Sequence, residues 1–178
     1  MSVEESKEYH AQQIQLLKYA GADLISAFTL NYIEEGIGIA LAAKEKEVPL
    51  VLSFTVETDG LLPSGDTLTQ AIQTIDQRTD SYPAYYMINC AHPSHFLTTL
   101  ESGKDALKRI LGIRANASCK SHAELDEALE LDAGDPKKLA DWYAKMYSLM
   151  PHLQVFGGCC GTDEVHLSAI AKKIMITV

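Results

Sequence analysis

Five short apolar runs alternate along the chain with segments whose apolar residues recur at helical spacing. The runs occupy residues 22–28, 50–56, 84–89, 112–117 and 153–157, and the main helical segments occupy 6–20, 31–47, 67–78, 136–150 and the residues from Thr162 onward. Each run is followed by a helical connection, so the pattern predicts an α/β fold of parallel strands. In the first helix, Ile14, Leu17 and Ala20 are predicted to face the core.

The composition places the chain among globular proteins and excludes two classes of partner. Its 178 residues are 47% hydrophobic and carry a formal net charge of −9, which repels nucleic acid and anionic membrane surfaces. No apolar run approaches the roughly 20 residues of a membrane-spanning helix, and the first residues are acidic rather than basic. We therefore expect a single domain over residues 1–178, located in the cytoplasm.

All four cysteines fall at predicted strand ends, where folds of parallel strands carry their chemistry. Neighbouring side chains on a strand point to opposite faces, so Cys159 and Cys160 can reach one metal ion only if the backbone leaves β geometry. The glycines at 157, 158 and 161 permit this departure. Three thiolates, Cys90, Cys159 and Cys160, would form a soft site suited to Zn²⁺ with a fourth position open. The expected chemistry is attack by a zinc-activated substrate thiolate on an electrophilic carbon.

The segment Gly157-Gly158-Cys159-Cys160-Gly161-Thr162, together with Asn89-Cys90, resembles the zinc-dependent homocysteine S-methyltransferase family. The resemblance extends from about His10 to the final helix. It implies a (β/α)8 TIM barrel in which Cys90, Cys159 and Cys160 hold zinc and homocysteine sulfur takes the fourth place. It also implies methyl transfer from a sulfonium or quaternary ammonium donor, a small molecule, to that thiol, which gives methionine.

Two departures from the family pattern affect the expected function. Family members commonly place a glutamate for the substrate amino group where this sequence has Phe28, and Glu57 at the next strand end is a conceivable substitute. The chain matches only the last five βα units of the eight, so we expect an incomplete barrel, the C-terminal portion of the family fold. The alternative function is a non-catalytic zinc-binding fragment or subunit, a homo-oligomer or one completed by a partner chain, because an open sheet leaves unpaired edges.

Other polar residues near the strand ends are further candidates. Asn116 is predicted to contact the substrate or to order a loop, and His92 to position the methyl donor. His92 and His95 could also be ligands, although the three thiolates suffice, and Cys119 is expected to be a partly buried residue outside the metal site. A thiol-redox role for Cys159 and Cys160 is least favoured, because the Cys-x-x-Cys spacing is absent. The polar stretch from Ser118 to Gly134 is interpreted as a solvated connection.

Overall fold

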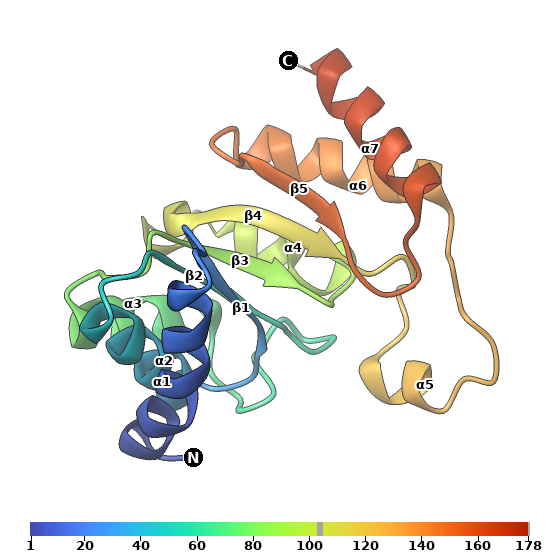
Figure 1. Cartoon of the computed structure of the whole chain (residues 1–178). Coiled ribbons are helices and arrows are strands. Elements are labelled where there is room, and N and C mark those ends of the chain that lie inside the picture. The colour runs from blue at the N-terminus through green and yellow to red at the C-terminus, as the bar shows by residue number, and fades with distance from the viewer. Residues whose placement is uncertain (103–104, 178) are drawn as a thin grey trace.

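The computed structural model describes residues 1–102 and 105–177 and contains one sheet of five parallel strands (Figure 1). The strands lie in chain order and are β1 (Ile25–Leu30), β2 (Leu50–Phe54), β3 (Tyr85–Asn89), β4 (Ile110–Ala115) and β5 (Val155–Gly158). Within the described residues, β1 pairs only with β2 and β5 only with β4. The sheet is therefore open, with β1 and β5 as its edge strands. This confirms the predicted incomplete α/β barrel.

Helices connect successive strands and pack mainly against their neighbours in the chain. They are α1 (Val3–Tyr19), α2 (Ile33–Glu45), α3 (Leu68–Thr79), α4 (Pro93–Glu101), the 3₁₀ helix η1 (Asp105–Arg109), α5 (His122–Asp126), α6 (Pro136–Leu149) and α7 (Glu164–Thr177). Local sequence explains where three helices begin. Ser2 forms a capping box at the start of α1 and Thr67 at the start of α3, and Asp135 caps α6, which has Pro136 in its first turn. No helix in the described part of the chain has both the length and the apolar character needed to cross a membrane.

The two faces of the sheet have different roles. Leu50, Leu52 and Ile88 lie on the face that packs against the helices and belong to the main hydrophobic core. Val51 and Met87 are buried outside that core, because side chains alternate between faces along a strand. On this inner face, Arg114 of β4 is exposed near the carboxyl end of the sheet. Polar side chains are thus available at the strand ends.

The first helix and strand differ from the sequence prediction. Strand β1 begins at Ile25 rather than at residue 22, because the Ala22 N–H bonds to the Leu17 carbonyl and closes the end of α1. Ile14 is buried as expected, but Leu17 is 41% exposed and Ala20 is also exposed. Leu17 lines an open hollow along β1, where no further strand covers it among the described residues. The inward prediction for these two side chains was wrong because helical periodicity does not show whether another element covers that face of α1.

The connection from Ser118 to Gly134 is not entirely irregular. It contains α5, a short helix whose N-terminus is a capping box formed by Ser121 and Glu124. The Ser-x-x-Glu spacing is a known helix-start signal, and it was available in the sequence. Figure 1 shows α5 near the carboxyl ends of the strands, joined to β4 and α6 by two extended segments.

Tyr143 of α6 ties the last two strands together, and its removal gives the first testable prediction. The fully buried hydroxyl donates to the Gly157 carbonyl at 2.6 Å and accepts from the Ala115 N–H at 2.9 Å. Tyr143→Phe leaves the Ala115 N–H unpaired and is expected to lower the free energy of unfolding by about 2 kcal/mol. Urea unfolding measures this loss. Tyr147→Phe is the control, with an expected change below about 0.5 kcal/mol, and equal losses in both variants would contradict the assignment.

Candidate metal centre

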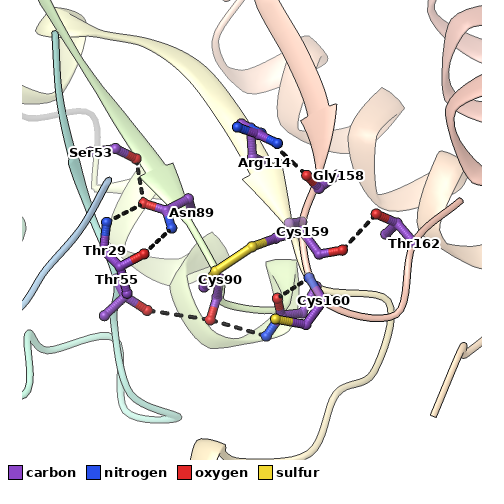
Figure 2. Close-up of a disulfide and its surroundings, with 12 residues drawn as sticks. Thr29, Ser53, Thr55, Asn89, Cys90, Arg114, Gly158, Cys159, Cys160 and Thr162 are labelled. Carbon is purple, nitrogen blue, oxygen red and sulfur yellow. Dashed lines mark hydrogen bonds between the residues drawn. A yellow bond between two sulfur atoms is a disulfide. The ribbon is translucent and has the colours of Figure 1, made fainter. Parts of the chain in front are cut away.

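Three cysteine sulfurs from two strand ends form a cluster (Figure 2). Cys90 follows β3, whereas Cys159 and Cys160 follow β5, and the three Sγ atoms lie within 4.8 Å of one another. Cys90 and Cys159 are half-buried and joined by a disulfide, with a Cα–Cα distance of 5.4 Å, and Cys160 is exposed with a free thiol. The parallel sheet thus brings Cys90 close to Cys159 and Cys160, although they are far apart in sequence.

Glycines allow the two adjacent cysteines to leave strand geometry. Strand β5 ends at Gly158, and Gly161 adopts a φ of 78°, in the left-handed region that favours glycine. A Cβ at Gly158 would lie 2.7 Å from the Thr162 Cβ, so any larger residue would collide with Thr162. The Thr162 hydroxyl donates to the Cys159 carbonyl at 2.7 Å and closes the turn. The predicted departure from β geometry is therefore observed.

The donor set fits a single soft metal ion. Tetrahedral zinc with thiolate bonds of about 2.3 Å holds sulfur atoms about 3.8 Å apart. Three sulfurs that lie within 4.8 Å of one another are near enough to share one such ion once the disulfide is reduced. Thiolates are soft ligands that bind zinc, whereas hard cations such as Mg²⁺ and Ca²⁺ bind oxygen ligands. The disulfide and a metal ion are alternative uses of Cys90 and Cys159, because a disulfide sulfur carries no thiolate. The cluster could therefore hold a metal only when these two residues are reduced.

Asn116 joins the two cysteine-bearing segments. It is 3% exposed, its Nδ2 donates to the Cys90 carbonyl at 3.0 Å, and its Oδ1 accepts from the Cys160 N–H at 3.1 Å. Both polar atoms are thus engaged with the cluster, which matches the loop-ordering alternative. Its contact with a substrate stays a prediction.

Glu57 lies in a contact that the sequence did not reveal. Its Oε1 is 3.2 Å from Nδ1 of His122 in α5, and His122 Nε2 donates to the Cys90 carbonyl at 2.6 Å. Burial opposes protonation of His122, but the bonds to Cys90 and Glu57 raise its pKa above the ordinary value. His122 therefore ties α5 to the cysteine cluster. The capping box at Ser121 was the only sequence signal for its placement, and the role of Glu57 in substrate binding stays a prediction.

The two histidines after Cys90 do not join the sulfur cluster. His92 caps α4, accepts from the Ser94 N–H at 3.2 Å and packs edge-on against Trp142. Burial, with a smaller contribution from His95, lowers the pKa of His92 to about 4, so the ring is neutral at physiological pH. His95 lies 2.9 Å from the carbonyl of Cys119. Cys119 is outside the cluster, and it is exposed rather than partly buried as expected. A donor-positioning role for His92 stays a prediction.

A cavity of about 220 Å³ adjoins the cluster. Its wall includes Cys90, Cys160, Asn116 and His122, and the segments around α5 complete it with Leu125 and Leu131 among others. A larger hollow lies between α6 and α7, but it contains no cysteine. The smaller cavity is therefore the one associated with the thiol chemistry.

Known proteins with similar sequences are methyltransferases. The sequence profile described as Homocysteine S-methyltransferase matches residues 1–174. Homocysteine S-methyltransferase 1 of Arabidopsis thaliana is 23% identical over 98% of this chain and 53% of its own length. Selenocysteine Se-methyltransferase of Brassica oleracea var. italica is 26% identical over 98% of the chain and 50% of its own length. The chain spans about half the length of the curated relatives that it matches.

Solved structures show the same fold. The apo form of the homocysteine methyltransferase MmuM from Escherichia coli has a TM-score of 0.74 at 20% identity, over 97% of this chain and 58% of MmuM. A metallated form of MmuM gives a TM-score of 0.74 and an oxidized form 0.71. The profile match covers nearly the whole sequence, so this chain belongs to the homocysteine S-methyltransferase family.

Proposed function

We propose that this chain binds one Zn²⁺ through Cys90, Cys159 and Cys160 and transfers a methyl group to the thiol of homocysteine, giving methionine. The observation that carries the proposal is the approach of the three sulfurs to within 4.8 Å in a chain of this family. The need for three reduced thiols favours a reducing compartment such as the cytoplasm.

The proposed reaction needs a strong sulfur nucleophile. Zinc held by Cys90, Cys159 and Cys160 would supply this nucleophile, because a thiol that ligates zinc is deprotonated at neutral pH. The sulfur then forms a bond to the methyl carbon, while the bond from that carbon to the positively charged sulfur or nitrogen of the donor breaks. The donor leaves as a neutral thioether or tertiary amine with the bonding electron pair, and the thiol proton has already passed to solvent. A sulfonium or quaternary ammonium donor therefore needs little acid assistance.

The chain's own residues hold the cluster and bound the space next to it. Asn116 fixes the Cys90 and Cys160 segments relative to each other, and His122 fixes α5 against Cys90. Of the three predicted substrate residues, Glu57 has the most freedom, because its side chain is 40% exposed and its one partner among the described residues is His122. Asn116 and His92 are almost fully buried and already bonded, so we assign them a supporting position.

A second candidate function rests on the open sheet. The unpaired edges of β1 and β5 favour a metal-binding subunit that becomes active only when further βα units, from a partner chain or a second copy, close the barrel. Exposed side chains along the β1 edge, Leu17, Leu24 and Phe28, support this candidate. The domain covering residues 1–178 then acts as one unit of an assembly.

An activity assay separates the two candidates. Reduced, zinc-loaded protein is incubated with homocysteine and either a sulfonium or a betaine donor, and methionine is measured by mass spectrometry. The first candidate predicts methionine formation by the isolated chain. Formation only after addition of a barrel-completing polypeptide supports the second candidate. Absence of methionine with every donor, alone or in the assembly, refutes methyl transfer.

A further inference from the structure

Arg114 is a charged residue on the inner face of the sheet that the proposed chemistry does not yet use. It lies opposite Asn89 of β3 and opposite Gly157 of β5 in the strand register, at the end of the sheet that carries the cysteines. Its side chain is exposed, although neighbouring residues on both sides of it in β4 are buried. The exposed charge therefore points into the interior that the curved sheet partly encloses.

The side chain is held in place by three contacts. Its Nε donates to the Gly158 carbonyl at 3.2 Å, and its guanidinium carbon lies 5.0 Å from the centre of the Phe28 ring across the sheet (Figure 2 shows the bond to Gly158). Its aliphatic part covers Gly157, where a Cβ would lie 3.0 Å from the Arg114 Cγ. A cation placed over an aromatic face gains electrostatic stabilisation. The guanidinium is thus oriented before any ligand binds.

The charge has no anionic partner in the residues that the structure describes. Gly158 and Phe28 are the two partners of the guanidinium there, and neither is a carboxylate. Arginine has five N–H donors and remains protonated in proteins. The N–H groups on both Nη atoms are therefore available as a planar fork, the geometry that matches a carboxylate.

Arg114 is linked to both segments that carry the cysteines. The Gly158 carbonyl that it binds belongs to the peptide unit joining Gly158 to Cys159. Its own carbonyl accepts from the Cys90 N–H at 3.1 Å. The position of the guanidinium relative to the sulfur cluster is therefore fixed by the backbone of β4 and β5.

We propose that Arg114 binds the carboxylate of a thiol substrate whose sulfur lies at the three cysteines, and so selects thiol carboxylic acids. This inference rests on the proposed function and adds the substrate class that the site favours. Homocysteine belongs to that class. The guanidinium of Arg114 would bind only the carboxylate, so binding does not require an α-amino group. Phe28 takes part as a positioning residue, because it contacts the guanidinium and carries no charge of its own.

A binding measurement with matched thiols tests the proposal. Reduced, zinc-loaded protein is titrated calorimetrically with γ-mercaptobutyrate and with the alcohol of the same chain length, which carries a hydroxyl in place of the carboxylate. We expect the carboxylate to bind about tenfold more tightly. Arg114→Gln should abolish this preference, whereas Arg78→Gln, which removes an exposed positive charge on α3, should retain it. Equal affinities in the wild-type protein, or an unchanged preference in Arg114→Gln, would overturn the proposal.

A second measurement needs neither zinc nor methyl transfer. Reduced, metal-free protein carrying Cys119→Ser is treated with an aromatic disulfide bearing carboxylates and, separately, with a neutral dipyridyl disulfide. We expect Arg114→Gln to lower the ratio of the two reaction rates about fivefold, because the cation attracts the anionic reagent, and Arg78→Gln to leave it unchanged. If zinc-loaded protein binds neither thiol, the proposed function is contradicted, while the rate ratio still decides the role of Arg114. An unchanged ratio in Arg114→Gln overturns that role.

Discussion

Replacing Cys159 by Ser is expected to abolish zinc binding. The reduced wild-type chain should hold about one zinc ion, because three thiolates and one open position make a tetrahedral site. A serine hydroxyl in place of the Cys159 thiol has a similar size but does not ionise near neutral pH, so two thiolates would remain. Metal analysis by inductively coupled plasma mass spectrometry after gel filtration should find zinc near background in Cys159→Ser.

The matched control for this experiment is Cys119→Ser. Cys119 is exposed and lies outside the cluster, so this variant should keep the full complement of zinc. Both proteins are reduced before loading, because the disulfide between Cys90 and Cys159 withdraws two ligands. Circular dichroism shows whether each variant retains its secondary structure. Full zinc retention by a folded Cys159→Ser variant would rule out the proposed ligand set.

Asn89→Leu is expected to cause the largest loss of stability. Asn89 is 2% exposed, its Oδ1 accepts from the Thr29 N–H at 3.0 Å and the Ser53 hydroxyl at 2.6 Å, and its Nδ2 donates to the Thr29 hydroxyl at 2.8 Å. Figure 2 shows this side chain joining β3 to the ends of β1 and β2. Leucine has a similar volume but leaves three polar groups without their partner. The free energy of unfolding should fall by about 4 kcal/mol in urea denaturation.

A double variant separates lost hydrogen bonds from poor packing. Removing the second partner with Ser53→Ala in the Asn89→Leu background eliminates one buried, unpaired hydroxyl. The double variant should therefore be more stable than Asn89→Leu alone by about 1 kcal/mol. Ser53→Ala alone should instead destabilise the wild-type protein. If the two substitutions are simply additive, the network does not have the energetic role described.

The sequence predicted the order of elements and the thiol cluster for the same reason. Apolar runs such as residues 50–56 and the glycines around Cys159 are local signals, and parallel strands place their carboxyl ends together. Local signals also explain the helix start at Asp135. The exposure of Leu17 was mispredicted because helical periodicity identifies an apolar face but does not indicate whether another element covers it.

The contacts around the cluster could not be predicted because they are long-range. The pair of Glu57 and His122 joins residues 65 positions apart, and it depends on where α5 lies. The contact of Arg114 with Phe28 depends on the curvature of the sheet, which brings β4 and β1 into reach across its inner face. The sequence around Glu57 does not indicate His122 as its partner, and the sequence around Arg114 does not indicate Phe28. The sequence therefore identified the three cysteines that cluster but not the polar groups that contact their backbone.

The sequence spacing of the three clustered cysteines affects when the proposed metal site can form during synthesis. Cys90 and Cys159 are separated by 69 residues, and the segment between them includes β4, α5 and α6. Cys90 therefore leaves the ribosome well before Cys159 and Cys160 are synthesised. A metal ion bound before that point would have fewer than three thiolate ligands. The free energy of metal binding would stabilise the fold only after β5 has formed. The proposed metal centre would therefore be completed only after β5 has formed, late in the synthesis of the chain.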